Sequence, residues 1–231
     1  MSRRRATKVK KEPTLGVILQ LKVRLIDVSP MVWRRVLVPA AYTLQELHGT
    51  VQVAMGWEAI HLYQFKIRAV HYGSYHLGAS SPQESIEHFR FRKGSKFIYE
   101  YDMGDLWQHE IRVEDGFDLQ PGQPYPICTD GGHACPPEGC GGPAAYVGRR
   151  QEALGGFEAM DDLDTLSRLI NPIVLENNIG LLDDPEVLWE LERAINRTKT
   201  RERFLAETFS LHAVNARFLQ DDHHVLMHQQ L

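Results

Sequence analysis

The residues best suited to chemistry are three cysteines in one short segment. Cys128, Cys135 and Cys140 are the only cysteines in the 231-residue chain, and His133 lies between the first two. Thiolates bind Zn²⁺ at about 2.3 Å, and three of them leave one position of a tetrahedral site for a further ligand. His133 or a histidine from a strand could supply it. The spacing predicts a structural zinc site; free thiols on a packed loop are the alternative.

The segment around these cysteines is unusual in composition. Residues 116–143 contain six of the twelve prolines and seven of the eighteen glycines. A loop of this length without secondary structure is uncommon inside a compact domain unless something holds it in place. Structural zinc contributes about 10–16 kcal/mol in small peptides, which is enough to order such a loop. Three cysteines in a chain that we expect to be cytoplasmic argue against a disulfide framework.

A second candidate site surrounds a polar turn. Asp102 and Asp105 precede His109 closely, and His61 begins an earlier strand. Carboxylates and imidazoles bind metals and also act as general acids and bases. One hypothesis is therefore a metal-dependent hydrolase that uses Asp102, Asp105, His109 and His61. The alternative is structural, because aspartates favour turns and His109 alternates with apolar residues as a packed core histidine would.

Two further groups of residues invite a chemical interpretation. Trp33-Arg34-Arg35 places two cations beside an aromatic ring, which is typical of a solvated edge strand and, secondarily, of anion binding. His223, His224 and His228 lie near the end of the chain. On an exposed tail we interpret them as incidental. The sequence lacks the Walker A, GxGxxG, GxSxG and HExxH motifs.

Charge is distributed unevenly along the chain. The formal net charge is −4, yet six basic residues precede the first acidic one, Glu12. These six are Arg3, Arg4, Arg5, Lys8, Lys10 and Lys11. Such a tail can contact nucleic acid through phosphates, but we favour a disordered solubilising terminus, because base readout needs more than charge. Nucleic-acid binding is therefore an alternative function.

Hydrophobic periodicity predicts the elements that position these residues. Apolar residues alternate over 15–28, 31–38, 61–69, 97–101 and 107–113, which favours strands. Thr43 and Glu46 form a capping box that starts a helix, and Gly56 ends it. We expect an α+β fold: a mainly antiparallel sheet of about five strands, one helix after the first hairpin, a Cys/Pro/Gly-rich loop and a C-terminal helical extension.

The same patterns suggest three regions. Residues 1–13 are expected to be a disordered basic tail, residues 14–157 an α+β domain, and residues 158–231 a helical extension whose last dozen residues fray. No stretch approaches the roughly 18–20 apolar residues of a membrane helix. The N-terminus lacks the apolar core of a signal peptide, so we expect a cytoplasmic protein, and we expect it not to contact membranes.

Several motifs in the same order resemble one family. They are Pro30-Met-Val-Trp-Arg-Arg-Val, Thr43-Leu-Gln-Glu-Leu-His48, Gly56-Trp57, His61-Leu-Tyr-Gln-Phe65, Tyr99-Glu-Tyr-Asp-Met-Gly-Asp105, Trp107-Gln-His109 and Cys135-Pro-Pro-Glu-Gly-Cys-Gly-Gly142. Over residues 15–155 the chain resembles the plasmid pRiA4b open-reading-frame-three-like family. The resemblance implies an association with plasmids and mobile elements, where some passenger proteins are described as resolvases, and it implies no defined activity.

The chain departs from that family's pattern at two positions. Met103 stands where phenylalanine is usual, and Gly139 stands where aspartate usually follows Glu138. The missing aspartate weakens any role of that acidic pair as metal ligands. A resolvase is also chemically unsupported, because Ser29 precedes a proline between strands and no recognition helix is evident. The sequence thus favours a zinc-stabilised interaction module that binds an unknown protein partner.

Overall fold

The computed structural model describes residues 16–154, 156–205 and 208–230. Seven antiparallel strands form one sheet in the order β4-β3-β5-β6-β1-β2-β7. The strands are β1 (Val17–Leu25), β2 (Trp33–Pro39), β3 (Tyr63–Ile67), β4 (Val70–Gly73), β5 (Lys96–Tyr101), β6 (Trp107–Asp118) and β7 (Ile127–Gly132). The predicted α+β class and antiparallel pairing agree with this sheet, whereas the prediction of about five strands is wrong.

The two strands that the prediction omitted lie at the two edges of the sheet. β4 is four residues long and pairs with β3 and, through one isolated bridge, with Ser80, and β7 pairs with β2 inside the Cys/Pro/Gly-rich segment. Short edge strands with polar residues and glycine carry little hydrophobic alternation of their own. Their conformation depends on a partner strand that is distant or irregular in sequence, so local periodicity does not reveal them.

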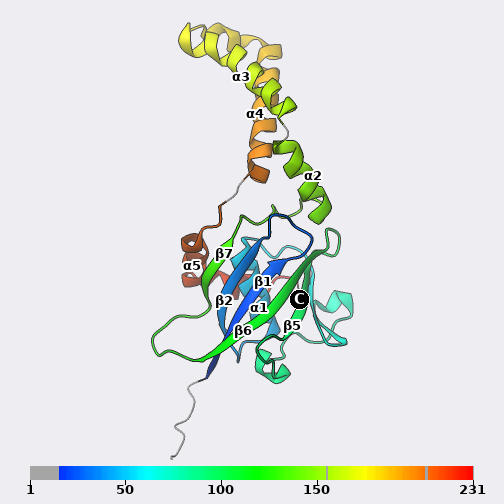
Figure 1. The fold of residues 1–231 in the computed structure, drawn as a ribbon. Coiled ribbons are helices and arrows are strands. Elements are labelled where there is room, and N and C mark those ends of the chain that lie inside the picture. Colours follow the sequence, from blue (N-terminus) through cyan, green and yellow to red (C-terminus); the bar gives the residue numbers. More distant parts are fainter. Residues whose placement is uncertain (1–15, 155, 206–207, 231) are drawn as a thin grey trace, which may run out of the picture.

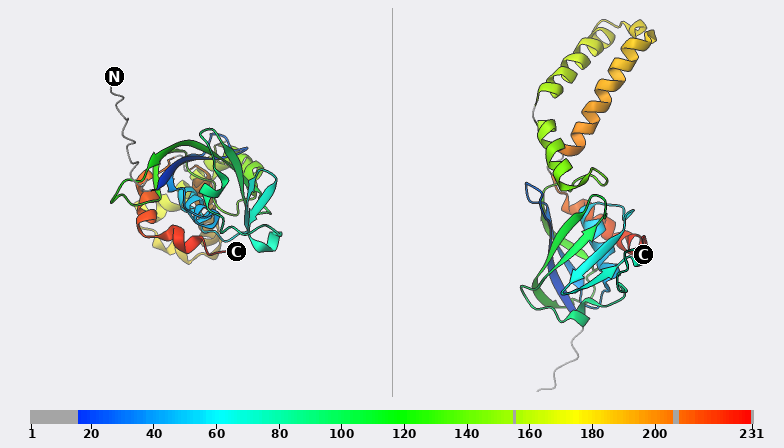
Figure 2. Two further views of the ribbon diagram at one scale, coloured as in Figure 1. Left: turned by 90° about the horizontal axis from the view of Figure 1, so that it is seen from below. Right: turned by 90° about the vertical axis from the view of Figure 1, so that its right-hand side faces the viewer.

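The sheet curves around helix α1 (Leu44–Met55), as the view along the barrel-like body shows (Figure 2, left). The predicted capping box is present, because Thr43 accepts from the Glu46 amide and the Glu46 side chain accepts from the Thr43 amide. Gly56 ends the helix with a φ of 84°, a left-handed conformation that favours glycine. Almost every residue of α1 is buried, so this helix forms the centre of the core.

The C-terminal half contains five further α-helices, most of which lie either in a projecting arm or against α1. These are α2 (Gly142–Leu154), α3 (Phe157–Leu175), α4 (Pro185–Leu205), α5 (Leu211–Leu219) and α6 (Asp222–Leu226). Helices α3 and α4 pack side by side and project from the body as an arm (Figure 1; Figure 2, right). The chain then returns, and α5 and α6 pack against α1 on the side that the sheet leaves open.

This return corrects the expectation that the last dozen residues fray. His223 and Leu226 are buried, and the α6 backbone approaches α1 so closely that a Cβ at Gly49 would lie 2.0 Å from the His223 carbonyl oxygen. Only glycine fits at that crossing. Among the described residues, none of the helices combines the length and the apolar character needed to cross a membrane.

Candidate functional site

The Asp102 turn joins β5 to β6 and is held by one carboxylate. Asp102 has a φ of 57°, a left-handed conformation that is uncommon outside glycine. Its Oδ1 atom accepts hydrogen bonds from the backbone amides of Gly104, at 3.0 Å, and Asp105, at 3.3 Å. Its Oδ2 atom lies 3.4 Å from Nε2 of His61. One oxygen thus fixes the turn while the other faces an imidazole.

The cysteine-bearing loop docks onto this turn through a second acid. Tyr101 donates its hydroxyl hydrogen to Oε1 of Glu138, and the Glu58 amide donates to Oε2 at 2.9 Å. Burial, and then the Glu138 carboxylate, raise the pKa of Tyr101, so its hydroxyl stays a donor. The Tyr101 hydroxyl also accepts from the His61 amide at 3.2 Å. His61, Tyr101, Asp102 and Glu138 therefore form one polar junction, which we call the loop–turn junction.

Two more hydrogen bonds fasten the same loop. The indole Nε1 of Trp57 donates to the Pro136 carbonyl at 2.9 Å, and the Gly141 amide donates to Oδ2 of Asp105 at 2.8 Å. Protein contacts therefore order the loop directly. The sequence identified Asp102, Asp105 and His61 as candidates. It assigned no role to Trp57 and Tyr101 and considered Glu138 only as a weakened metal ligand, although all three lie within the motifs quoted above.

His109 lies apart from the loop–turn junction. Its side chain is fully buried, with ring centroids 5.4 Å from Trp57 and 5.2 Å from Tyr99. Neither ring nitrogen has a hydrogen-bond partner among the described residues, and burial lowers its pKa to about 3. Alternation along β6 turns His109 into the core, as the structural alternative predicts. The four residues of the hydrolase hypothesis thus do not converge.

The cysteines are distributed over β7 and the loop that follows. Cys128 is buried in β7 and its thiol donates to the Asp130 carbonyl at 3.4 Å, Cys135 is half-buried, and Cys140 is buried. His133 is exposed. Within the described ranges, the single set of three candidate ligand atoms lying within 4.8 Å of one another comes from Asp221, His223 and His224. A zinc ion on the cysteines would require their sulfur atoms to move together, and it stays a prediction.

A buried arginine faces the thiols. Arg34 is 2% exposed, and its guanidinium donates to the carbonyls of Ala54, Trp33 and Gly132 at 2.8–3.1 Å. Burial lowers its pKa, and the nearby Cys135 and Cys128 partly oppose that shift. The interpretation of residues 33–35 as a solvated edge strand is therefore wrong, because Arg34 is buried and β2 lies between β1 and β7. Because alternate residues of a strand face opposite sides, Arg34 faces inward while Arg35 pairs with Glu114 on the outer face.

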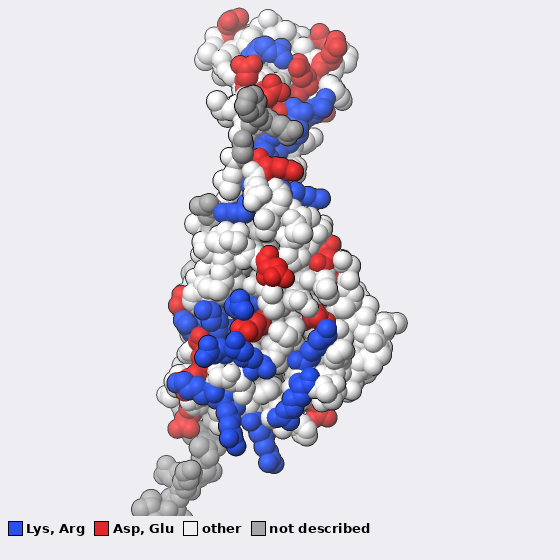
Figure 3. Space-filling model, turned by 45° about the vertical axis from the view of Figure 1, so that its right-hand side comes forward, with Lys and Arg blue, Asp and Glu red and all other residues white. Residues whose placement is uncertain are grey.

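The outer face of the sheet is rich in cations. Lys and Arg side chains gather over the lower part of the body in Figure 3. Most have acidic partners: Arg24 and Lys96 pair with Glu110, and Arg35 pairs with Glu114. Surface pairs of this kind are typical of a solvated face. The six basic residues of the predicted nucleic-acid contact lie outside the described residues.

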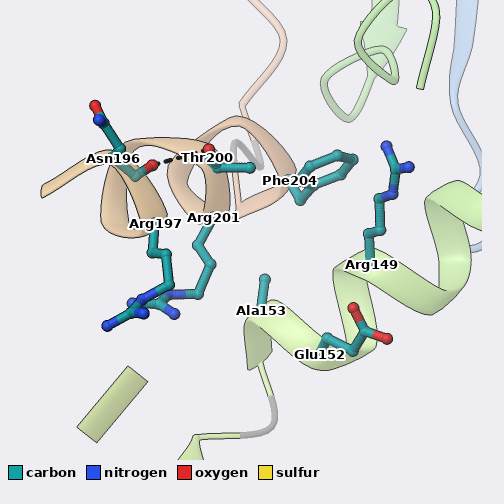
Figure 4. A pocket seen from close by; sticks show the side chains of 8 residues that line it. All are labelled: Arg149, Glu152, Ala153, Asn196, Arg197, Thr200, Arg201 and Phe204. Carbon is teal, nitrogen blue, oxygen red and sulfur yellow. Dashed lines mark hydrogen bonds between the residues drawn. The ribbon is translucent and has the colours of Figure 1, made fainter. Parts of the chain in front are cut away.

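A pocket of about 380 Å³ lies between α2 and α4. Figure 4 shows Arg197 and Arg201 extending to one side of it and Arg149 to the other. Arg197 and Arg201 both bind the buried Asp162 carboxylate, whereas Arg149 lies over the Phe204 ring at 5.8 Å. Because the guanidinium groups diverge, the pocket does not present them to a single anionic ligand.

Comparisons with known proteins identify the family of the sheet domain. Residues 17–154 match the profile described as plasmid pRiA4b ORF-3-like protein. The chain belongs to this family. The matched range covers the sheet, α1, the loop–turn junction and α2, and it excludes the arm and the returning helices α5 and α6.

Two relatives of the family domain support this placement. The chain is 36% identical over 135 residues to uncharacterized protein y4hQ of Sinorhizobium fredii (strain NBRC 101917 / NGR234), covering 56% of this chain and 69% of that protein. The crystal structure of protein MM3350 from Methanosarcina mazei Go1, of unknown function, is similar with a TM-score of 0.57 and 32% identity. That similarity covers 63% of this chain and 85% of MM3350.

A first testable prediction follows from the geometry of the Asp102 turn. Asp102→Ala is expected to lower the free energy of unfolding by about 2–3 kcal/mol, because alanine loses two accepted hydrogen bonds and disfavours positive φ. Asp102→Asn keeps an acceptor oxygen and tolerates this conformation, so it should cost less than half as much. Urea denaturation at pH 7 measures both. Equal losses would show that the charge facing His61 matters more than the turn.

Proposed function

We propose that the protein is an interaction module that self-associates through the arm of α3 and α4. The observation that carries this proposal is an apolar face of the arm that nothing in the described chain covers. The proposal concerns the region beyond the family match, and the sheet domain serves as the body that holds the arm.

The inner contact of the arm accounts for only part of its apolar surface. Leu169 of α3 and Ala194 of α4 are buried between the two helices. Asp162 on the same inner face binds Arg197 and Arg201, and its Oδ1 atom lies 2.8 Å from Nε of Arg197. Burial alone would raise the pKa of Asp162, but hydrogen bonds from these two arginines lower it. The hairpin is thus fastened near its base by an ion-pair network.

One side of the hairpin is polar. Arg168 of α3 and Glu190 of α4 form an ion pair at 2.9 Å on this side. A hollow between the two helices is lined there by Asp161, Glu186 and Arg193, among others. A helix presents residues three and four apart on one side, so residues about half a turn away from these lie on the opposite side.

The opposite side of the hairpin is apolar. Helical spacing places eight side chains on it, and four of them are exposed: Leu163 by 59%, Ile170 by 37%, Val174 by 67% and Leu188 by 39%. The others are half-buried. The complete set, here called the apolar flank, is Leu163, Leu166, Ile170, Ile173, Val174, Leu188, Leu191 and Ile195. A two-helix arm with one apolar flank lacks the second layer that a stable helical domain needs.

A second copy of the chain fits this flank. Two hairpins related by a two-fold axis across the arm form a four-helix bundle, with α3 against α3 and α4 against α4, both antiparallel. In that arrangement Leu163 of one copy faces Ile170 of the other. Glu192 and Lys199 border the flank on α4, on either side of Ile195 in the sequence. In this dimer Glu192 of each copy faces Lys199 of the other copy. Opposite charges at such positions favour this antiparallel alignment.

The size of the flank agrees with a dimer interface. Burying a leucine-sized side chain corresponds to roughly 60–120 Å² of apolar surface. Eight half-exposed side chains therefore offer about 400 Å² per copy, close to the apolar share of a standard interface of about 800 Å² per partner.

The mass of the chain in solution tests the proposal. Sedimentation equilibrium of the untagged protein, from about 1 to 100 μM, should give twice the 26.4 kDa of one chain. A mass of 26.4 kDa at every concentration would rule out self-association.

This proposal does not require the predicted zinc. Hydrogen bonds of Trp57, Glu138 and Gly141 already hold the cysteine-bearing loop. A hydrolase is less well supported, because His109 lies in the core and only His61 contacts Asp102.

A further inference from the structure

The turn between α5 and α6 brings together three side chains that can bind a metal ion. Asp221, His223 and His224 each offer a ligand atom, and these atoms all lie within 4.8 Å of one another. Asp221 precedes α6 with a φ of 60°. This backbone conformation brings its carboxylate to the same side as the two imidazoles. The histidines that looked incidental in the sequence are therefore part of a cluster.

His223 is the unusual member of this cluster. It is 1% exposed, and neither of its ring nitrogens has a hydrogen-bond partner among the described residues. Its ring lies between Tyr42 and Phe218, with centroids at 6.4 and 5.7 Å, and 4.1 Å from the ring of His224. A buried polar group without a partner is costly and calls for an explanation. A bound cation would supply the missing partner.

We propose that Asp221, His223 and His224 bind a divalent transition-metal ion, with Zn²⁺ as the expected occupant. Two imidazole nitrogens and one carboxylate oxygen are a borderline ligand set that suits zinc. Tetrahedral zinc with bonds of about 2.0–2.2 Å places its ligand atoms about 3.3 Å apart, so small side-chain rotations from 4.8 Å or less complete the site. Three protein ligands leave the fourth position for water.

The surroundings of the cluster favour a cation. The carboxylates of Asp221, Glu46 and Asp222 lie near the His223 ring, so negative charge surrounds the cluster. His224 is half-buried and Asp221 is exposed, so an ion can enter from solvent on their side.

The site would also fasten the end of the chain to the core. α6 packs directly on α1 at Gly49, and the Gln45 side chain donates to the Met227 carbonyl at 2.9 Å. Binding to the folded state alone stabilises it by mass action. Metal binding should therefore raise the melting temperature of the whole chain.

Calorimetric titration of the chelator-treated, untagged chain with Zn²⁺ tests the proposal. The expected result is one strong site per chain whose affinity falls at least about tenfold in Asp221→Asn and further in His224→Gln. Asparagine tolerates the left-handed conformation at position 221, so this variant should remain folded. His228→Gln is the matched control, since it removes a neighbouring imidazole outside the cluster. The Zn²⁺-induced rise in melting temperature should follow the same order.

Co²⁺ as a probe separates this site from the predicted cysteine site. Nitrogen and oxygen ligands give visible bands without the intense near-ultraviolet sulfur charge-transfer band that thiolates produce. Absence of Zn²⁺ binding, or binding that both Asp221→Asn and His224→Gln leave unchanged, would overturn the proposal. A sulfur charge-transfer band that accounts for all the bound Co²⁺ would do the same.

Discussion

Acidification from pH 7.5 to pH 5.0 is expected to lower the free energy of unfolding by about 4 kcal/mol through His48 and His109, at 1.36 kcal/mol per pH unit for each. Both side chains are fully buried, and burial lowers the pKa of each from 6.5 to about 3. Between these two pH values the unfolded chain binds protons that the folded chain excludes. This stability is therefore complete above pH 6.5 and is lost progressively as the pH falls toward 3.

The contacts of the two rings explain why they stay neutral. Gln52 donates to the Tyr99 hydroxyl at 2.7 Å, and that hydroxyl lies 2.7 Å from Nδ1 of His48. Burial raises the pKa of Tyr99 well above its usual value, so the hydroxyl donates to Nδ1 and His48 carries its hydrogen on Nε2. His109 lacks even one such partner within the described residues. Protonating either ring would bury an uncompensated charge.

A single substitution isolates the contribution of His109. His109→Phe should remove about 2 kcal/mol of the pH dependence and leave stability at pH 7.5 equal or higher, because an apolar ring joins Trp57 and Tyr99 without orphaned nitrogens. Urea denaturation at both pH values measures this change. His76→Gln, which removes an imidazole from an exposed 3-10 helix, is the control. An unaltered pH dependence in His109→Phe would contradict the burial argument.

The elements that sequence periodicity predicted are those whose signals are local. The helix from Leu44 to Met55 carries its own cap and stop, and the strand containing His109 shows uninterrupted alternation. β7 gave no such signal, because its residues 129–132 are Thr-Asp-Gly-Gly and become a strand only by pairing with β2. The same limitation hid the return of α6, which depends on the absence of a side chain at Gly49, far away in sequence.

The candidate site residues were likewise predictable only where their signal is local in the sequence. Asp102 and His61 could be identified by residue type, but their contact depends on Tyr101, which accepts from the His61 backbone and donates to Glu138. The three cysteine sulfur atoms do not all lie within 4.8 Å of one another, because Cys128 belongs to a strand and the others to a loop, and zinc binding by them stays a prediction. Spacing along the chain predicts a shared site only where the backbone between the residues is short and regular.

Charge introduced on the apolar flank is expected to convert the dimer into monomers. Leu163→Glu combined with Ile170→Glu places four carboxylates in the bundle, where each replaces an apolar side chain that loses water on association. The expected loss is at least about 4 kcal/mol, or roughly a thousandfold in Kd. Leu175→Glu is the matched control, because Leu175 is 77% exposed on the same helix but faces away from the flank. It should leave the mass doubled.

Charge reversal at the border of the flank tests the orientation of the two arms. Glu192→Lys alone and Lys199→Glu alone each place like charges opposite one another twice in an antiparallel dimer, and each should weaken it by up to about tenfold. An equimolar mixture of the two variants restores both opposite-charge contacts, so a heterodimer should form in preference to either homodimer. In a parallel dimer α4 faces α3 of the partner, residues 192 and 199 do not meet, and the mixture would show no preference. Native mass spectrometry with one variant isotopically labelled distinguishes these outcomes, because it resolves the heterodimer from the two homodimers by mass. Only in the antiparallel bundle do the two variants, each weak as a homodimer, have complementary charges.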